Sequence, residues 1–382
     1  MPTSSKWMVS RAFLDGIFKN SNNSDYRALP TQSSQGIIKQ CLQDWSSYLE
    51  LAKKYREDKN SLTGKPNIPR YAKKDGRKIA IITNQDAVIY PKKEQSGFEL
   101  KLPKTKIRYN LGQFQPEGKL KEVRIIPKGT GYTLELVCEV LVDTVQVTKE
   151  TSKRIAAIDL GVNNFVTMTN NIGQRPIIIK GGKLKSKNQW HNKQRAHYYG
   201  ILRQGKSPKE GQFNSKRLTH LDEKRHRFIK DFFHKASKEI TNYCIENQID
   251  TVVIGKNKGW KTDVQINMKD KQSFIQIPFN RFISILTYKL EAVGILVIES
   301  EESYTSKASF LDRDEIPTYG EEKETLQFGG YRKTRGIYKS HKHGLINADV
   351  NGSANILRKV FPSAFTDRDR GVLKAPKSLL VA

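Results

Sequence analysis

Apolar side chains recur at near-helical spacing in the first part of the chain. Between Gln35 and Tyr55 they alternate with Lys and other polar residues, and this pattern predicts an amphipathic helix. From residue 79 the pattern changes to short β-rich runs that Gly, Pro and Lys turns separate. These runs predict a small antiparallel β region with strands at 79–83, 98–101, 123–127 and 132–140.

In the second half, apolar runs of strand length alternate with runs of helical period. Three consecutive strands are expected at 155–160, 165–169 and 176–180, followed by a long basic helix at 215–247. The remaining expected elements are a strand at 251–254, a helix at 279–293, a strand at 295–298, a polar loop and a closing helix at 351–360. This β-β-β-α-β-α-β-α order predicts an α/β, RNase H-like domain with a mixed sheet, in which the first, fourth and fifth strands are parallel.

Length and composition predict three regions. A chain of 382 residues exceeds one typical hydrophobic core. Residues 1–78 are expected to form a helical region with a basic loop, and residues 79–153 the small β domain with a polar linker. Residues 154–382 are expected to hold the RNase H-like domain and a basic C-terminal tail.

Charge indicates the class of partner. The 67 Lys and Arg residues exceed the 39 Asp and Glu residues and leave a formal charge of +28, which attracts polyanions such as nucleic acids. The Lys- and Arg-rich stretch at 59–78 is typical of a phosphate-contacting loop or of a merely solvated one, and the charge of the whole chain favours the first. Lys73, Lys74 and Arg77 are therefore candidate nucleic-acid contacts.

Other classes of protein receive little support. No apolar run approaches the roughly 20 residues that span a bilayer, and no signal-peptide pattern opens the chain, so we expect a soluble cytoplasmic protein. Three separate cysteines form no Cys-x-x-Cys pair and indicate neither disulfides nor a zinc site. His341 and His343 are interpreted as part of a solvated loop, because two histidines alone make a poor zinc cage.

Two aspartates stand where an RNase H-like sheet would bring them together. Asp159 ends the apolar run that starts at Ile155 and precedes a Gly and Asn turn, so a buried strand delivers its carboxylate. Asp349 opens the small-residue segment before the last helix. Asp159 could instead cap its turn, and Asp349 could be an N-cap or first-turn acid. Their joint occurrence in this topology favours a pair of Mg²⁺ ligands.

A two-metal site needs a third carboxylate. The fourth strand offers none, because Gly255 follows Ile254, but the fifth strand runs into Glu301 and Glu302. Neighbours on a strand point to opposite faces, so one of the two is expected to face the site, with Glu302 slightly favoured. The alternative that both are surface acids stays open.

Four separated motifs carry a family resemblance. They are Ile158-Asp159-Leu160-Gly161-Val162-Asn163, the segment 253–261, the segment 301–310 and the segment 347–355. In this order, they resemble the RuvC segments of TnpB proteins, the relatives of type V CRISPR effectors, over about residues 154–360. The segments 26–30 and 65–77 are similar, less distinctively, to the guide-binding region of that family.

The resemblance implies an RNA-guided DNA endonuclease. A guide RNA from the transposon end would pair with target double-stranded DNA, and the N-terminal domain would recognise a short adjacent motif. Cleavage would use Mg²⁺, with Mn²⁺ as a substitute, held by Asp159, Asp349 and Glu302 or Glu301. Two rival hypotheses remain: a nuclease-dead RNA-guided DNA-binding protein, which Gly255 favours, and a basic structural RNA-binding protein.

The chain departs from the family pattern in three respects. Gly255 stands where many members carry a glutamate, so the resemblance implies that this ligand has moved to Glu301 or Glu302. Many members also have a four-cysteine zinc ribbon, whereas Ser309, Asp312 and Tyr338 stand in that region here, and we expect no zinc. Finally, the chain begins near Trp7 within the family's N-terminal region, so an initial strand of the β domain is expected to be missing.

Overall fold

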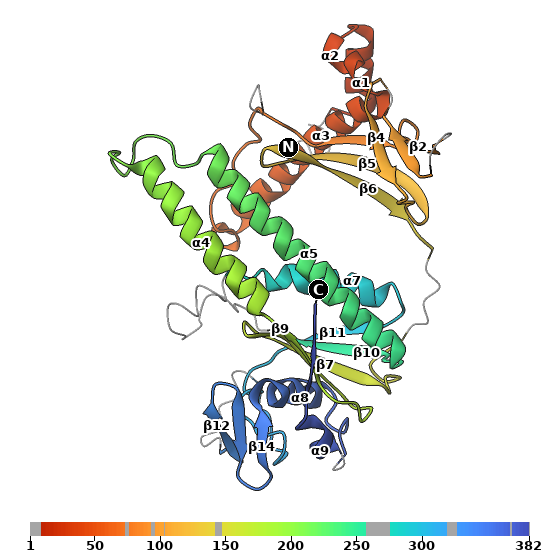
Figure 1. Ribbon diagram of the computed structural model, residues 1–382. Helices are drawn as coiled ribbons and strands as arrows, with labels where there is room; N and C mark the ends of the chain where they lie inside the picture. Colours follow the sequence, from red (N-terminus) through yellow and green to blue (C-terminus); the bar gives the residue numbers. More distant parts are fainter. Residues whose placement is uncertain are drawn as a thin grey trace. The chain divides into compact units, whose positions relative to one another are not determined.

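The structure is a computed structural model in which the chain divides into two compact units, Met1–Leu141 and Val142–Ala382 (Figure 1). It describes residues 9–72, 76–92, 96–102, 104–141, 147–256, 276–318, 327–366 and 369–381. Within these ranges, no helix is long and apolar enough to cross a membrane.

The first unit opens with helices. They are α1 (Arg11–Asn20), α2 (Ser24–Ala28) and α3 (Thr31–Glu57), followed by the short 3-10 turn η2 (Lys59–Ser61). The predicted amphipathic helix is thus confirmed and extended at both ends. Ser34 of α3 donates a 2.6 Å hydrogen bond to the carbonyl of Tyr26, whose ring stacks on Phe18 with centroids 5.8 Å apart.

Two antiparallel three-stranded sheets complete the first unit. One has the order β1-β5-β6 and the other β2-β3-β4. Their bounds are β1 (Ala80–Thr83), β2 (Val88–Pro91), β3 (Phe98–Lys101), β4 (Arg108–Gly112), β5 (Lys119–Lys128) and β6 (Gly131–Glu139). The four predicted strands are present, and β2 and β4 are additional. Ile82, Leu100 and Val123 form part of the small core between them.

A six-stranded mixed sheet organises the second unit, in the order β11-β10-β7-β8-β9-β15. Its strands are β7 (Ile155–Leu160), β8 (Asn164–Asn170), β9 (Ile177–Lys180), β10 (Thr251–Gly255), β11 (Leu296–Ser300) and β15 (Lys377–Leu379). Strands β7, β10 and β11 are parallel, as predicted, and β8 is antiparallel to β7. The last strand, β15, pairs with β9 in a segment that we had expected to be only a basic tail.

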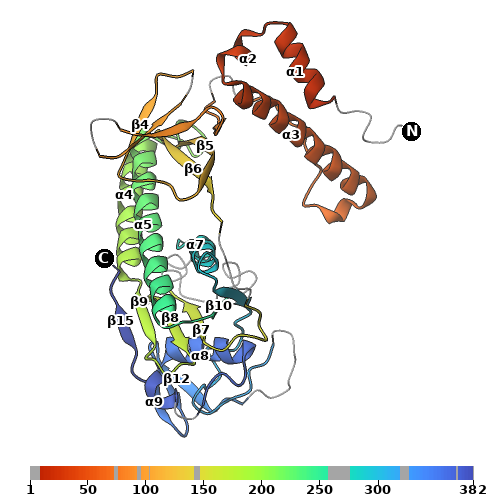
Figure 2. The ribbon, with the colours of Figure 1, turned by 90° about the vertical axis from the view of Figure 1, so that its right-hand side faces the viewer.

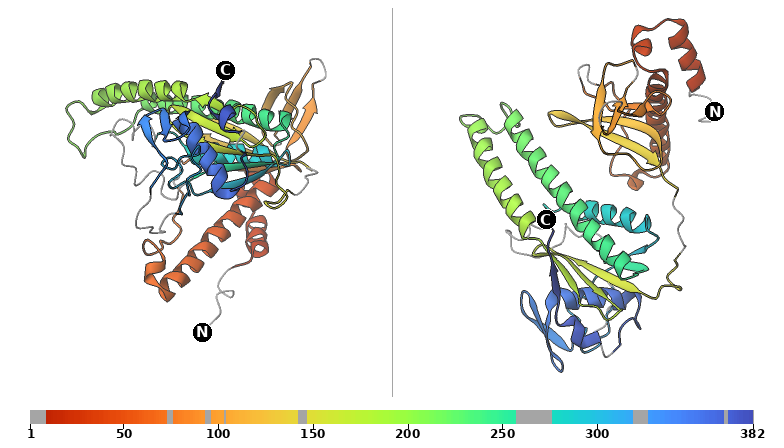
Figure 3. Two further views of the ribbon diagram at one scale, coloured as in Figure 1. Left: turned by 90° about the horizontal axis from the view of Figure 1, so that it is seen from below. Right: turned by 45° about the vertical axis from the view of Figure 1, so that its right-hand side comes forward.

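Helices cover both faces of this sheet (Figures 1 and 3). Side chains alternate along β7, so Ala156 and Ile158 pack with α5 (Lys216–Glu246) and α7 (Phe279–Glu291). Ile155 and Ala157 pack on the opposite face, against Ile356 and Leu357 of α8 (Ala348–Val360). The face that meets α8 is therefore the face of the odd-numbered residues of β7.

Two larger parts of the second unit were also not predicted. Helix α4 (Gly182–Arg203) runs beside α5 in a long hairpin, and Lys, His and Asn residues leave it too few apolar positions for a helical pattern (Figure 2). The prediction of a polar loop before α8 is wrong. This segment contains a small sheet of β12 (Gly330–Thr334), β13 (Ile337–Ser340) and β14 (Gly344–Asn347). These strands are short and largely exposed, so their apolar content is low. A final helix, α9 (Asp369–Leu373), precedes β15.

Candidate carboxylate centre

Strand β7 places Asp159 on the sheet face that α8 covers. Asp159 has the same parity as Ile155 and Ala157, which pack against α8. Its cross-strand partner on β8 is Thr167, so these two side chains share a face. The hydroxyl of Thr167 is buried and has no hydrogen-bond partner among the described residues.

Polar side chains hold α8 close to the sheet. Ser353 donates a 2.9 Å hydrogen bond to the carbonyl of Ala157, two residues before Asp159. Asn351 and Asn355 donate to the carbonyl of Ala308, each at 2.8 Å. All three side chains are fully buried. Ser353 thus joins α8 to β7, and Asn351 and Asn355 join α8 to the segment after β11.

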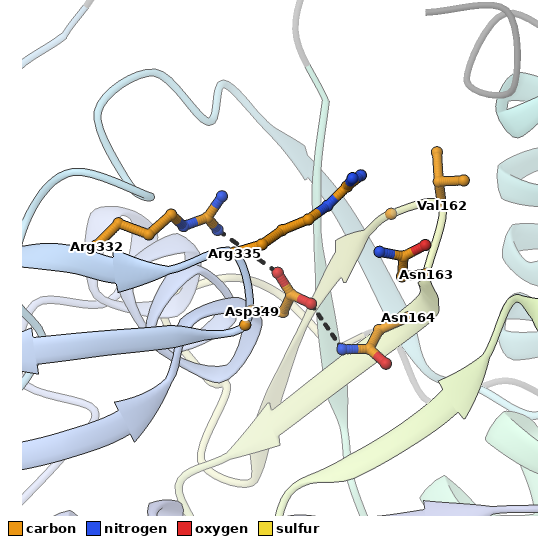
Figure 4. Close-up of a pocket in the computed structure, with 8 residues that line it drawn as sticks. Val162, Asn163, Asn164, Arg332, Arg335 and Asp349 are labelled. Atoms are coloured by element: carbon orange, nitrogen blue, oxygen red, sulfur yellow. Dashed lines mark hydrogen bonds and ion pairs between the residues drawn. The ribbon is translucent and has the colours of Figure 1, made fainter. Parts of the chain in front are cut away.

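Asp349 lies in the first turn of α8. The helix is capped by Asn347, whose side chain accepts from the amide of Asp349 at 3.0 Å, so Asp349 is not the cap. One oxygen of Asp349 accepts a 2.7 Å hydrogen bond from Asn164, and the other lies 3.6 Å from the guanidinium of Arg332 (Figure 4). Asn164 also accepts from Lys180 at 3.0 Å. The sheet and β12 therefore both contact this carboxylate.

Two glycines give the remaining carboxylates room. A Cβ on Gly352 of α8 would lie 2.9 Å from Oδ2 of Asp159. On Gly255, at the end of β10, a Cβ would lie 2.8 Å from Oε2 of Glu302 and 2.5 Å from Cδ1 of Ile356. A side chain at either position would need its neighbours to move. The carboxylate of Glu302 therefore occupies space next to the strand end where the chain has no acidic residue of its own.

The three carboxylates interact electrostatically. Burial, followed by the negative charges of Glu302 and Asp349, raises the pKa of Asp159 well above its usual value, and Arg332 acts in the opposite direction. Like charges that converge in a protein disfavour full ionisation unless a cation compensates them. The site is therefore one in which negative charge is concentrated and only partly neutralised.

Glu301 has a different environment from its neighbour. Its carboxylate forms an ion pair with Lys359 of α8, whose side chain is 11% exposed, and accepts a 2.5 Å hydrogen bond from the amide of Ser303. Burial alone would raise the pKa of Glu301, but the hydrogen bonds from Lys359 and Ser303 hold it below its usual value. Glu301 thus anchors the segment after β11, while Glu302 lies beside Gly255.

A cavity of about 260 Å³ opens next to Asp349. It is lined by the turn between β7 and β8 and by the tip of the β12–β13 hairpin, which contributes Arg332 and Arg335. Figure 4 shows both arginines reaching toward the cavity from one side, with Asn163 and Asn164 opposite. Negative and positive side chains thus meet at its wall.

The donor set bears on which ion could bind. Within the described part of the chain, no three His, Cys, Asp or Glu side chains already form a metal-binding group. The three acids nevertheless supply only carboxylate oxygens, which hard cations such as Mg²⁺ and Mn²⁺ prefer. The repulsion on Asp159 and the unpartnered hydroxyl of Thr167 beside it also fit a cation with bound water.

The predicted nucleic-acid contacts belong to the first unit. Lys73 and Lys74 lie outside the described residues. Arg77 lies 5.4 Å from the ring centroid of Tyr132 and donates a 3.1 Å hydrogen bond to the carbonyl of Gly131. It also donates to the carbonyl of Gly129. Arg77 is thus attached to the turn between β5 and β6.

Sequence reasoning missed several residues at the centre. Arg332 lies on β12 and Arg335 in the turn before β13, in a segment that was expected to be a loop, and no local pattern pairs Arg332 with Asp349. The buried hydroxyl of Thr167 follows from β-strand alternation once β7 and β8 are aligned, so the sequence contained that signal. The steric role of Gly352 was indicated only by the run of small residues around it.

The chain is similar to known families in two segments. Residues 136–261 match the OrfB_IS605 family, described as a probable transposase, and residues 279–356 match the Cas12f1-like TNB domain family. Among curated proteins, none matches the chain.

Solved structures also resemble the chain at low sequence identity. One is a Cas12f1–sgRNA–target DNA complex, with 17% identity, a TM-score of 0.49, and coverage of 92% of this chain and 76% of that chain. Another is a CRISPR-Cas12f ternary complex, with 16% identity, a TM-score of 0.38 and coverage of 92% and 75%.

Proposed function

The chain is a TnpB-like relative of the type V effectors, and on this premise we propose that it is an RNA-guided DNA endonuclease with an RNase H-like catalytic domain. The proposed substrate is double-stranded DNA that pairs with a guide RNA next to a short motif. The order of strands and helices in the second unit and the mixed sheet with parallel β7, β10 and β11 support the RNase H-like assignment.

One observation carries the catalytic part of the proposal. Asp159 on β7, Asp349 on α8 and Glu302 after β11 come from three separate elements, and burial, together with the charges of the last two, raises the pKa of the first. Carboxylates with strongly perturbed pKa values cluster at functional sites. We assign Asp159, Asp349 and Glu302 as the metal-binding residues and give Glu301 a structural role.

Different residues of this chain would bind the metal ion and the phosphate during hydrolysis. When bound, Mg²⁺ supplies Lewis acidity and neutralises charge that develops on the phosphate. The three carboxylates would hold the ion, and Arg332 would contact the phosphate that enters beside Asp349. In the reaction, a water oxygen would form a bond to phosphorus and give up one proton to solvent. The bond from phosphorus to a deoxyribose oxygen would break, and that oxygen would leave with a proton from solvent.

The α4–α5 hairpin offers a surface for the nucleic acid. Lys187 and Lys224 lie 4.4 and 5.6 Å from the ring centroid of Trp190, which is 39% exposed. Further along, Arg203 lies 4.4 Å from the ring centroid of Phe213. Cations contact phosphates and aromatic rings stack on unpaired bases, so this combination suits a single-stranded segment of nucleic acid.

The experiment begins with the RNA that copurifies with the full chain. We expect sequencing to find a discrete transcript, and a target DNA that pairs with it should be cut in Mg²⁺ or Mn²⁺. Cutting should stop in EDTA and return when Mg²⁺ is added. A matched DNA with a scrambled target sequence is the control for non-specific nuclease.

The possible outcomes distinguish the hypotheses. A discrete transcript with specific binding of the matched target but no cleavage would replace this proposal by the nuclease-dead, RNA-guided DNA-binding protein. A heterogeneous mixture of RNAs, with no preference for any matched DNA, would favour a basic RNA-binding protein. Cutting that EDTA leaves unchanged would exclude the proposed metal chemistry.

A further inference from the structure

Two turns in the second unit share a spacing and a backbone shape. The first runs from Ser309 to Asp312 and the second from Ser340 to His343, each spanning four residues. The residue after each turn has a positive φ, 58° at Arg313 and 84° at Gly344. Paired four-residue turns of this kind are how small zinc sites place four ligands around one ion.

Amide groups in both turns point at the first side chain. The amide of Asp312 donates to the hydroxyl oxygen of Ser309 at 3.2 Å. In the second turn, the amides of Lys342 and His343 donate to the hydroxyl oxygen of Ser340 at 3.2 and 2.8 Å. Both serines are fully buried. The backbone thus has the arrangement of a metal knuckle, with hydroxyls at its centre.

The side chains at the four positions do not fit zinc. Structural zinc sites use four ligands from Cys, His and acidic residues, and serine hydroxyls are not among them. Asp312 and His343 would provide two ligands at most. Both oxygens of Asp312 also already accept hydrogen bonds, from Ser309 at 2.5 Å and from Ser340 at 2.9 Å.

We propose that Asp312 replaces a metal ion as the centre of this knuckle and holds the two turns together without zinc. The carboxylate joins them directly, because Ser309 donates to one oxygen and Ser340 to the other. Asp314 adds a parallel link by accepting from the amides of Ser309 and Gly329 at 2.6 and 2.8 Å.

Close packing around the knuckle supports a permanent structural role. A Cβ on Gly329 would lie 2.7 Å from Cβ of Asp312 and 2.8 Å from Oδ1 of Asp314, so only glycine fits there without displacement. Gly329 immediately precedes β12, and Gly330 pairs with Ser340. The knuckle therefore fixes the base of the hairpin that carries Arg332 to Asp349.

The first test measures metal content and thermal stability of the full chain. Protein purified in zinc-containing medium should hold far less than one zinc per chain, and a zinc chelator should not change its Tm. Asp312→Asn should lower the Tm by several degrees, and added zinc should not restore it. The matched control is Asp231→Asn, because Asp231 is 63% exposed and pairs with Lys235 on its own helix.

A second variant tests the shape of the knuckle independently. The quadruple substitution S309C/D312C/S340C/H343C should bind about one zinc per chain and make the Tm sensitive to chelator. Stoichiometric zinc in the wild type, with a fall in Tm on chelation, would overturn the proposal. A folded quadruple variant that binds no zinc, or an Asp312→Asn variant as stable as Asp231→Asn, would overturn it as well.

Discussion

Two aspartates of the second unit, Asp159 and Asp312, occupy opposite electrostatic environments. Asp159 is surrounded by a buried sheet face and two further carboxylates, and its pKa is raised. Burial acts on Asp312 in the same direction, but hydrogen bonds from Ser309 and Ser340 hold the pKa of Asp312 below its usual value. The ionised carboxylate is therefore disfavoured at Asp159 and stabilised by hydrogen bonds at Asp312.

This difference separates the proposed catalytic centre at Asp159 from the proposed structural knuckle at Asp312. A hydrogen bond to a charged group stabilises a fold by about 1.5–3 kcal/mol, so Asp312 is expected to stabilise the unit. Three converging acids without a cation should destabilise it, and natural proteins retain such arrangements where function requires them. Without bound metal, the substitution of Asn for Asp should therefore raise the thermal stability at Asp159 and lower it at Asp312.

The largest expected effect is on guided cleavage. Asp159→Asn and Asp349→Asn should each reduce cutting below detection, because either change removes a proposed metal ligand, while guide RNA binding stays at the wild-type level. Asp312→Asn, assayed well below its Tm, should reduce the cleavage rate by at most about tenfold, which is the lower end of the effect for residues that do not bind the metal directly. Rates from a single-turnover assay in excess Mg²⁺ decide the matter. Cutting by folded Asp159→Asn at a substantial rate would remove Asp159 from the site.

The next effect is on stability, and its sign differs between the two sites. In EDTA, Asp159→Asn should raise the Tm, since it removes a charge that burial, Glu302 and Asp349 all disfavour. Asp312→Asn should lower it. A change of 1 kcal/mol shifts the Tm of a domain of this size by roughly 2–4 °C, which calorimetry resolves.

Added Mg²⁺ sharpens this test. It should raise the Tm of the wild type, because a bound cation relieves the repulsion, and leave the Tm of Asp159→Asn unchanged. Equal shifts in both proteins would mean that the ion binds elsewhere.

A smaller effect is expected in the first unit, away from both carboxylate sites. Charge reversal of Lys73, Lys74 and Arg77 together should weaken guide RNA binding most at low salt. It should also reduce the slope of log affinity against log salt by about 2, because each contact to single-stranded phosphate contributes about 0.7. Titrations at several salt concentrations measure both. Unchanged affinity at low and at high salt would exclude this loop from the interface.

The smallest effect concerns Thr167, whose buried hydroxyl has no partner within the described residues. Thr167→Val should keep or slightly raise the Tm, because valine has the same shape and no polar group to leave unsatisfied. Cleavage should fall by about tenfold or less if the hydroxyl orients water near the ion. Thr169→Val is the control, since Thr169 shares a 3.0 Å hydrogen bond with Ser353 and should lose stability. A Thr167→Val variant that loses stability to the same extent would show that its hydroxyl has a structural partner.

Strand patterns carried most of the fold prediction. The bounds of β7 and β3 agree with the sequence prediction to the residue, because each combines apolar or β-branched residues with clear flanking turns. Strands β12 to β14 were missed because their stability comes from the knuckle and from the buried Tyr338, not from a repeating apolar pattern. Tertiary contacts of that kind leave no periodic signal.

The candidate site was predictable as far as local sequence determines it. The strand end at Asp159 and the helix start at Asp349 follow from local patterns. Local patterns did not decide between Glu301 and Glu302, because β11 ends at Ser300 and side chains no longer alternate between faces beyond it. Lys359, which distinguishes them, is 58 positions from Glu301 in the chain.

The most direct test of the proposed centre compares guided cleavage by Glu302→Gln and Glu301→Gln. Glu299→Gln serves as the control, because Glu299 is 46% exposed and pairs with Lys256. We predict that Glu302→Gln folds normally and does not cut, whereas Glu301→Gln still cuts but melts at a lower temperature because Lys359 loses its charged partner. Cutting by Glu302→Gln at the wild-type rate, or loss of cutting in a fully folded Glu301→Gln, would contradict the assignment.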